Sequence, residues 1–125
     1  MKKYDSKYYK INAPNNRTVH IHIDYEKSSK KIKNVFIRIP PIGDEINILA
    51  AIFGAILSDY FDSGGDINKA IKHLHSAKSG SRAIEDNGEI VETVPHAIAM
   101  ALKQFKKDIL DEREKDGGDG SQITK

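Results

Sequence analysis

The sequence predicts one α+β domain in which an antiparallel β-hairpin packs against a long central helix. Three observations lead to this fold class. The chain has 125 residues, the size of one ordinary domain, and 38% of them are apolar. Residues 17–26 alternate between apolar and polar side chains, which is typical of a half-buried strand. Residues 45–61 instead carry apolar side chains at a helical spacing.

The first predicted elements are the two strands of the hairpin. In residues 17–26 the apolar side chains all fall on one face and the polar ones on the other. Residues 27–30 predict a turn, and residues 35–39 form a second alternating strand that ends at the Pro40–Pro41 pair. We expect a short strand over Tyr8–Asn12 at the edge of this pair.

The long helix is predicted to begin after Asp44, because a short carboxylate can accept the free amides of a first helical turn. It runs to about Phe61 and ends at Ser63-Gly64-Gly65, where glycine can adopt the left-handed conformation. Its apolar residues cover well over half of its circumference. Such a wide apolar surface predicts a central helix that packs on the sheet and on a neighbour.

Two further helices and a small hairpin are predicted after the long helix. Asp66 is expected to cap a short second helix, and residues 76–82 form a loop. Residues 86–89 are a strong signal for the tight turn of a small hairpin. Thr93 is expected to cap a C-terminal helix that has Pro95 in its first turn.

The ends of the chain are predicted to lie outside the folded part. Residues 1–7 are polar, and from residue 111 onwards charged residues and glycines predominate. The sequence therefore predicts a flexible N-terminus over residues 1–7, an α+β domain over residues 8–110 and a flexible tail over residues 111–125.

Charge is distributed unevenly along the chain. The net charge is only +2, which does not indicate a nucleic-acid binder, so nucleic acid is an unlikely partner. Residues 1–38 carry ten Lys and Arg against three Asp and Glu, whereas residues 39–102 carry four against nine. A basic front half and an acidic middle are compatible with two faces of one domain or with complementary surfaces in an oligomer.

No segment of the sequence has the character of a membrane span or a signal peptide. The longest apolar run is Ile46–Leu57, and its twelve residues are fewer than the ~20 that a transmembrane helix needs. The first residues include lysines but no apolar stretch follows them. We therefore expect no membrane partner and a cytoplasmic location.

Cysteine is absent from the sequence. This excludes disulfides, zinc sites built on thiolates, iron–sulfur ligation and a cysteine nucleophile. No serine lies in a Gly-x-Ser-x-Gly elbow, and no spacing sets a base against a particular hydroxyl. We therefore expect a protein without enzymatic activity and without a cofactor.

The spacing His20-x-His22-x-Asp24 is the one pattern that suits a metal ion. Alternate residues of a strand project to one side, so two imidazoles and a carboxylate could share an ion. The same alternation is also what a polar, solvent-facing strand requires. The sequence favours this second interpretation, with a metal at His20, His22 and Asp24 as the weaker alternative.

The segment Lys78-Ser79-Gly80-Ser81-Arg82 is the candidate anion site of the sequence. Glycine and serine let backbone amides turn inward, two hydroxyls add donors and two cations supply charge, a combination that suits phosphate. Arg38 is a further cation that could hold a phosphate with two hydrogen bonds. The alternative is a flexible loop without a ligand.

A second basic segment lies at the N-terminus. Lysines alternate with tyrosines over residues 2–10, as in surfaces that stack on single-stranded nucleic acid or a base. The sequence favours a solvated terminus in which one or two of the tyrosines pack on the sheet.

Four segments of the chain stand out at the joints between the predicted elements. They are residues 10–16, residues 43–45, residues 77–80 and residues 93–102, the last of which read Thr-Val-Pro-His-Ala-Ile-Ala-Met-Ala-Leu. Together they resemble the TSCPD domain, a small module found within or beside cobalamin-dependent ribonucleotide reductases. Residues 93–102 resemble the family's Ser-Cys-Pro-Asp stretch, which is followed by Ala-Ile-Ala and an Ala-Leu pair. Residues 10–16 resemble its Gly-Cys-Gly-type turn, residues 43–45 its Gly-Ser-Cys segment, and residues 77–80 fall where it has an Arg-Cys-Pro loop.

The chain departs from the family where the family carries cysteines. At those places it has Pro14 or Asn15, Glu45, Ser79 and Val94. A structural zinc site needs about four thiolate or imidazole ligands, so the resemblance implies a retained scaffold whose zinc site is lost. His96 also stands where the family usually has Asp.

The resemblance and the residues together imply a binding module. We expect a non-catalytic, TSCPD-like domain that forms a homo-oligomer and binds a small anionic, nucleotide-like ligand. One alternative is an accessory or interaction subunit of a ribonucleotide reductase. Another is a protein of a mobile genetic element, such as a phage, that sequesters a nucleotide second messenger.

Overall fold

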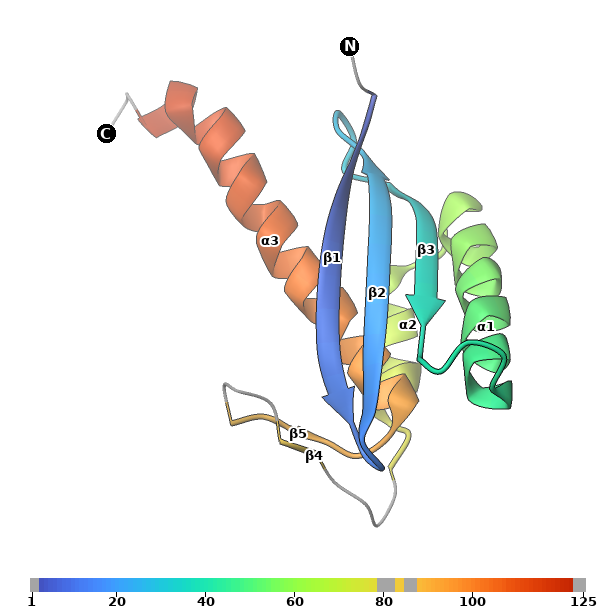
Figure 1. Cartoon of the computed structure of the whole chain (residues 1–125). Helices are drawn as coiled ribbons and strands as arrows, with labels where there is room; N and C mark the ends of the chain where they lie inside the picture. Colours follow the sequence, from blue (N-terminus) through green and yellow to red (C-terminus); the bar gives the residue numbers. More distant parts are fainter. Residues whose placement is uncertain (1–2, 79–82, 85–87, 123–125) are drawn as a thin grey trace.

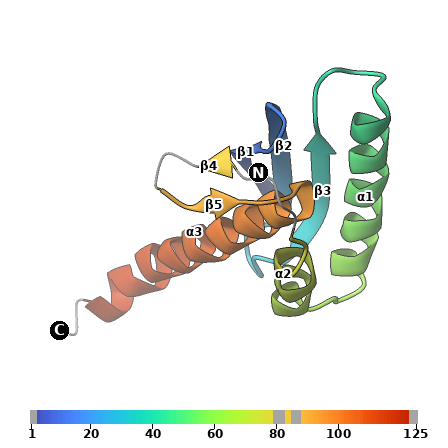
Figure 2. The same ribbon diagram turned by 90° about the horizontal axis from the view of Figure 1, so that it is seen from below.

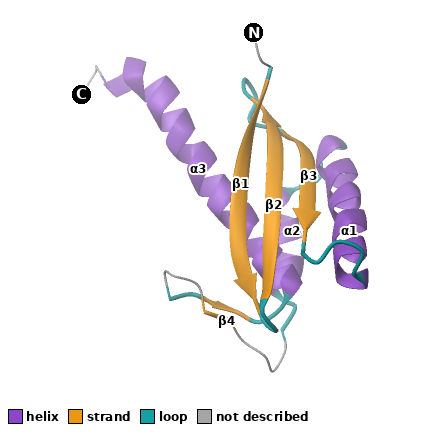
Figure 3. Cartoon of the chain, viewed as in Figure 1, coloured by secondary structure: helices purple, strands orange, loops and turns teal. Residues whose placement is uncertain are grey.

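The computed structural model describes residues 3–78, 83–84 and 88–122 of the chain, and it has the expected α+β fold. A three-stranded antiparallel sheet in the order β1-β2-β3 is combined with three helices and a small two-stranded sheet (Figures 1 and 3). The bounds of the elements in chain order are β1 Tyr4–Ala13, β2 Arg17–Glu26, β3 Ile32–Arg38, α1 Glu45–Asp62, α2 Ile67–His75, β4 Ala83–Ile84, β5 Ile90–Val91 and α3 Val94–Gln122.

Most of the predicted elements are confirmed. β2 and β3 form the antiparallel hairpin, and β4 pairs with β5 as the small hairpin. The side chains of Asp44 and Asp66 accept the amides of Ile46 and Asn68, at 3.2 and 2.7 Å, and so cap α1 and α2. The hydroxyl of Thr93 accepts the amide of His96 at 3.1 Å at the start of α3.

Two elements are longer than the sequence predicted. The edge strand expected over Tyr8–Asn12 is β1, which begins at Tyr4 and pairs with β2 from Tyr4↔Glu26 to Ala13↔Arg17. Residues 4–7, assigned to the flexible N-terminus, are therefore part of the sheet. Likewise α3 continues to Gln122, through most of the segment that was predicted to be a flexible tail.

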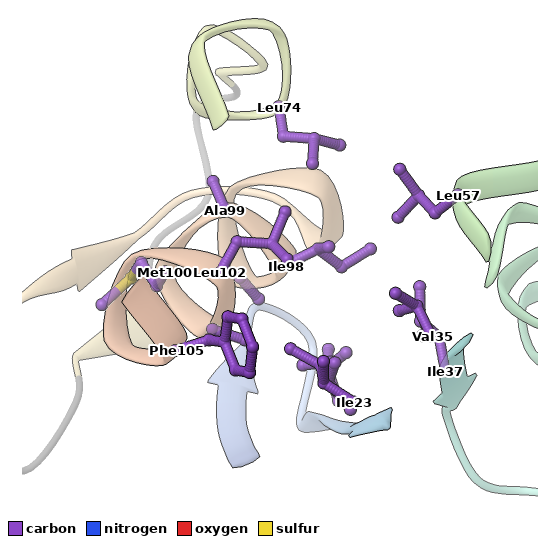
Figure 4. Packing of buried hydrophobic residues seen from close by; sticks show 14 of the residues in the cluster. Ile23, Val35, Ile37, Leu57, Leu74, Ile98, Ala99, Met100, Leu102 and Phe105 are labelled. Carbon is purple, nitrogen blue, oxygen red and sulfur yellow. The ribbon is translucent and has the colours of Figure 1, made fainter. Parts of the chain in front are cut away.

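The sheet is covered on one face by α3. Apolar residues of α3 are buried where the helix packs on β1 and β2, and α2 packs on α3 on the same side (Figure 2). Figure 4 shows Leu57 of α1 and Leu74 of α2 pointing toward Ile98 of α3. The other face of the sheet carries polar and aromatic side chains that stay in contact with solvent. Within the described residues, no helix is both long enough and apolar enough to cross a membrane.

The long helix α1 lies along the free edge of the sheet. β3 pairs with β2 on one side only, which leaves backbone groups of its other edge without strand partners. Ser58 of α1 accepts the amide of Val35 at 2.8 Å, and Asn47 accepts the amide of Ile39 at 2.8 Å through Oδ1. Side chains of α1 therefore take over hydrogen bonds that a fourth strand would otherwise make.

A glycine allows this close approach. A Cβ built on Gly54 would lie 2.9 Å from the carbonyl oxygen of Val35 and 3.2 Å from the amide nitrogen of Ile37. Both contacts are with backbone, which cannot move without disturbing the pairing of β3 with β2. Gly54 is thus required by the packing, although glycine inside a helix is disfavoured by about 1 kcal/mol relative to alanine.

We expect Gly54→Ala to lower the free energy of unfolding by about 1–3 kcal/mol, because overpacking outweighs the better helix propensity of alanine. Urea denaturation followed by circular dichroism measures the change. Ala51→Gly, at an exposed position of the same helix, is the matched control and should cost only about 1 kcal/mol. A Gly54→Ala variant more stable than the wild type would contradict the close packing of α1 on β3.

Candidate functional site

The solvent-facing side of the three-stranded sheet, which we call the open face, carries the two histidines of the predicted metal pattern. His20 and His22 lie on β2 beside Tyr8 of β1, whose hydroxyl is 2.5 Å from Nδ1 of His20. The Tyr8 ring also contacts His22, with 4.7 Å between ring centroids. Desolvation lowers the pKa of His20, and the nearby positive charges of Arg38 and Lys10 lower it further. His20 is therefore held as a neutral ring in a small aromatic cluster.

Two of the three candidate metal ligands on this face are hydrogen-bonded to side chains of β1. His20, His22 and Asp24 share the strand face as expected, but Asp24 accepts a hydrogen bond from the Ser6 hydroxyl at 2.6 Å. Among the residues that the structure describes, no three His, Asp or Glu side chains converge closely enough to hold an ion.

The predicted anion loop lies mostly outside the described residues. This applies to Ser79, Gly80, Ser81 and Arg82. Lys78 is described, and its Nζ is 3.5 Å from Oε2 of Glu92. Arg38 lies at the end of β3, is exposed and pairs with His20 of β2, whereas Lys78 follows α2. The described contacts therefore do not bring Arg38 and Lys78 together.

A cavity on the covered side combines cations with an apolar floor. It has a volume of about 490 Å³ and lies between α3, the β2–β3 turn and the junction of α1 with α2. We call it the basic cavity. Its lining residues are Lys30, Lys31, Ile32, Phe61, Gly64, Gly65, Ile67, Phe105, Lys106, Ile109, Leu110 and Arg113. Every charged side chain among these described lining residues is basic.

Three of the four cations donate to neutral oxygens. Lys31 donates to the backbone carbonyl of Asp62 at 3.0 Å, and Arg113 donates to that of Ser29 at 3.2 Å. Lys106 donates to the side-chain oxygen of Asn68. These contacts orient the cations through neutral oxygens, which leaves their positive charge able to attract an anion to the mouth of the basic cavity.

The fourth cation belongs to an ionic network that fixes α3 on the sheet. Nζ of Lys30 is 3.5 Å from a carboxylate oxygen of Glu112, which also forms an ion pair with Lys7 and accepts the hydroxyl of Tyr25 at 3.0 Å. Burial alone would raise the pKa of Glu112, but the hydrogen bonds from Lys7 and Tyr25 lower it overall. Glu112 therefore stays ionised and holds this part of α3, which forms one wall of the basic cavity.

Sequence reasoning missed this site because its cations come from distant parts of the chain. The sequence places Lys30 in a predicted turn, Lys31 directly after it, and Arg113 in the charged tail. The signals available were the doublets Lys30-Lys31 and Lys106-Lys107, but doublets of this kind are also common on solvated surfaces. Only the packing of α3 behind the sheet brings the two groups to one cavity.

His96, at the start of α3, is a buried polar side chain with 5% of its surface exposed. Its Nδ1 accepts the amide of Glu92 at 3.3 Å, and the ring meets that of His75 edge to face at 4.4 Å. Burial lowers the pKa of His96, and the neighbouring His75 and Lys78 lower it further. The imidazole is therefore neutral in the folded protein and acts as a hydrogen-bond acceptor at the β5–α3 junction.

The comparisons with known proteins give one match. The family model described as the TSCPD domain matches residues 2–106, most of the chain. No curated protein and no solved structure matches the chain significantly. The match covers all three strands of the large sheet, α1, α2, the small hairpin and the first half of α3.

We expect His96 to make the free energy of unfolding fall as the pH drops from about 6.5 to 5. Its pKa is lowered by folding, so below pH 6.5 the unfolded chain binds a proton that the folded protein does not. One such group contributes a slope of up to about 1.4 kcal/mol per pH unit. His96→Asn keeps an acceptor for the Glu92 amide but does not titrate, so the slope should become shallower.

Urea denaturation at pH steps between 5 and 7.5 measures this slope, in a range where carboxylates contribute little. Ala51→Asn is the control, because it introduces the same side chain at an exposed position of α1 and removes no titratable group. Equal slopes for the wild type and His96→Asn would contradict a buried, neutral His96.

Proposed function

The chain belongs to the TSCPD domain family, and we propose that it is a non-catalytic binding module that holds a small anionic, nucleotide-like ligand in the basic cavity. The observation that carries this proposal is the lining of the cavity. The lining combines four basic side chains with aliphatic and aromatic ones. No acidic side chain is found among the described residues that line the basic cavity.

The size and lining of the basic cavity suit a ligand with two parts. Its volume of about 490 Å³ falls within the range of ~300–1,000 Å³ that is usual for small-molecule sites. The floor residues Ile67, Ile109 and Leu110 offer contact to an apolar or planar body such as a base. The cations offer a counter-charge to phosphate, and Arg113 could hold two phosphate oxygens at once.

The contacts of the four cations favour a phosphate position on the side of the basic cavity away from Glu112. Lys31, Lys106 and Arg113 donate hydrogen bonds to neutral oxygens, so an anion there would meet three positively charged side chains. Lys30 is partly compensated by Glu112. We therefore place the phosphate of the ligand near Lys31, Lys106 and Arg113.

The chemistry of the lining supports binding rather than catalysis. The described residues of the basic cavity include no carboxylate, imidazole or hydroxyl side chain that could serve as a general base or an activated nucleophile. The sequence also contains no cysteine. A bound ligand is therefore expected to leave the protein chemically unchanged.

A second candidate function is that of an accessory subunit of a ribonucleotide reductase, which the likeness to reductase-associated TSCPD domains favours. Affinity purification of the tagged chain from its native extract tests this candidate. Recovery of a reductase would support it, and recovery of a different stoichiometric partner would count against it.

We expect at least one nucleotide in a panel of mononucleotides, cyclic nucleotides and cyclic dinucleotides to raise the melting temperature of the protein saturably. The double variant Lys106→Gln/Arg113→Gln should weaken binding at least about tenfold, because hydrogen bonds to charged groups are worth about 1.5–3 kcal/mol each. Thermal shift followed by titration calorimetry measures both effects. Mass spectrometry of the ligand released on denaturation should recover it unmodified.

The matched control is Lys72→Gln, which removes a charge from an exposed position on α2 that does not line the basic cavity. This variant should bind as the wild type does. A flat response to the whole panel at millimolar concentration would contradict the proposal, as would a double variant that binds with unchanged affinity.

A further inference from the structure

The outward face of α1 carries an unusual set of exposed aliphatic side chains. Ile48, Ile52 and Ile56 follow one another at intervals of four residues, and Leu49 lies beside them. Each of the four is between 53% and 58% exposed. We call these residues the α1 stripe. Single exposed aliphatic residues are ordinary on a protein surface, but a continuous stripe on one helix marks an interaction site.

The position of α1 explains why the stripe is uncovered. The residues of α1 that pack on the protein are Ala50, Gly54, Leu57 and Phe61. At about 100° of rotation per residue, Ile52 lies roughly opposite this buried side. Because α1 lies along the free edge of β3, its outward side points away from α2 and α3 (Figure 2).

An apolar groove lies directly beside the stripe. It has a volume of about 270 Å³ and separates α1 from the start of α3. Its lining residues are Ile39, Ile46, Leu49, Ala50, Phe53, Val94, Pro95 and Ile98. Leu49 belongs to both the groove and the α1 stripe. The two apolar features are therefore adjacent on one side of the molecule.

We propose that the α1 stripe and the groove beside it form the interface of a symmetric homodimer. A two-fold interface must be self-complementary, because each copy presents the same surface to the other. A stripe along one helix meets this requirement when the α1 helices of the two copies pack antiparallel, and the groove beside it extends the apolar contact. This inference does not depend on the ligand proposed for the basic cavity.

The sequence of the stripe has the symmetry that antiparallel pairing needs. Ile48 and Ile56 lie four residues before and after Ile52, and Glu45 and Asp59 lie seven residues before and after it. In an antiparallel pair with Ile52 on the two-fold axis, Ile48 of one copy faces Ile56 of the other. Glu45 and Asp59 then fall at the two ends of the contact, outside its apolar centre.

The area is sufficient for a dimer at the lower end of stability. A half-exposed aliphatic side chain offers on the order of 100 Å², so the stripe alone presents about 400 Å² per copy. Two copies together would bury about 800 Å² from the stripe and a little more from the groove, which is below the ~1,200 Å² at which stable interfaces begin and in the range of weak complexes. The net charge of +2 opposes association only weakly. We therefore expect a dimer that dissociates on dilution.

Light scattering after size exclusion and sedimentation velocity test this proposal on the full chain between about 1 and 300 µM. We expect the mass to rise with concentration from 14.0 kDa toward twice that value. Ile52→Glu should raise the dissociation constant at least about tenfold, and Ile56→Glu should act in the same direction. Both positions are exposed, so circular dichroism should show that the fold is unchanged.

The matched control is Phe36→Glu, which places the same charge at a residue that is 55% exposed on the open face of the sheet. It should dimerise as the wild type does. A wild type that stays monomeric at every concentration would overturn the proposal, and so would a dimer that survives Ile52→Glu or is lost with Phe36→Glu.

Two further readouts separate this dimer from a contact between oppositely charged surfaces. Because the apolar stripe is flanked by Glu45 and Asp59 in both copies, raising NaCl from about 0.05 to 0.5 M should strengthen association. Weakening by salt would overturn the proposal. The chain has no cysteine, so Ile52→Cys introduces a single thiol. Under mild oxidation, the introduced thiols of the two copies should form a disulfide across the two-fold axis, whereas those of Phe36→Cys should not.

Discussion

The packing of helix α1 on the free edge of β3 determines the rest of the architecture. An unpaired edge is the weak point of a small antiparallel sheet, because its backbone groups need partners and can recruit other strands. Here two polar side chains of α1 accept the amides of Val35 and Ile39, and Gly54 allows the helix backbone to approach the strand. A helix thus ends the sheet where a fourth strand would otherwise be needed.

This use of α1 has consequences for both candidate interaction surfaces. While α1 occupies the edge, α3 packs on β1 and β2, and later turns of α3 lie beside the β2–β3 turn, where the basic cavity forms. The network around Glu112 holds that wall in place. The same placement leaves the α1 stripe uncovered, because only the opposite side of the helix packs on β3. Ligand binding and self-association would therefore use separate surfaces.

The sequence predicted local structure well because the signals were local. Alternation identified β2, and the short carboxylates before α1 and α2 identified their first residues. The extent of β1 was underestimated because residues 4–7 lie on an edge strand that is mostly exposed, so no strong apolar alternation marks them. The apolar circumference of α1 indicated burial on two sides, whereas the structure buries one side and leaves the other exposed.

The candidate site could not be predicted because it depends on distant contacts. Lys31 and Arg113 are more than eighty residues apart in the chain and line one cavity only because α3 packs behind the sheet. The sequence placed its anion site at residues 78–82, most of which lie outside the described part of the structure. The family resemblance was confirmed over residues 2–106.

Amide hydrogen exchange on β3, read residue by residue by NMR, tests the role of α1 most directly. If side chains of α1 bond the free edge of β3, the amides of Val35 and of Ile39, which directly follows β3, should exchange as slowly as those of the central strand β2. Ser58→Ala should then release Val35, and Asn47→Ala should release Ile39, each with little effect on the other amide. Exchange of both amides in the wild type at the rate of an exposed turn, such as that of Ser29, would contradict the account.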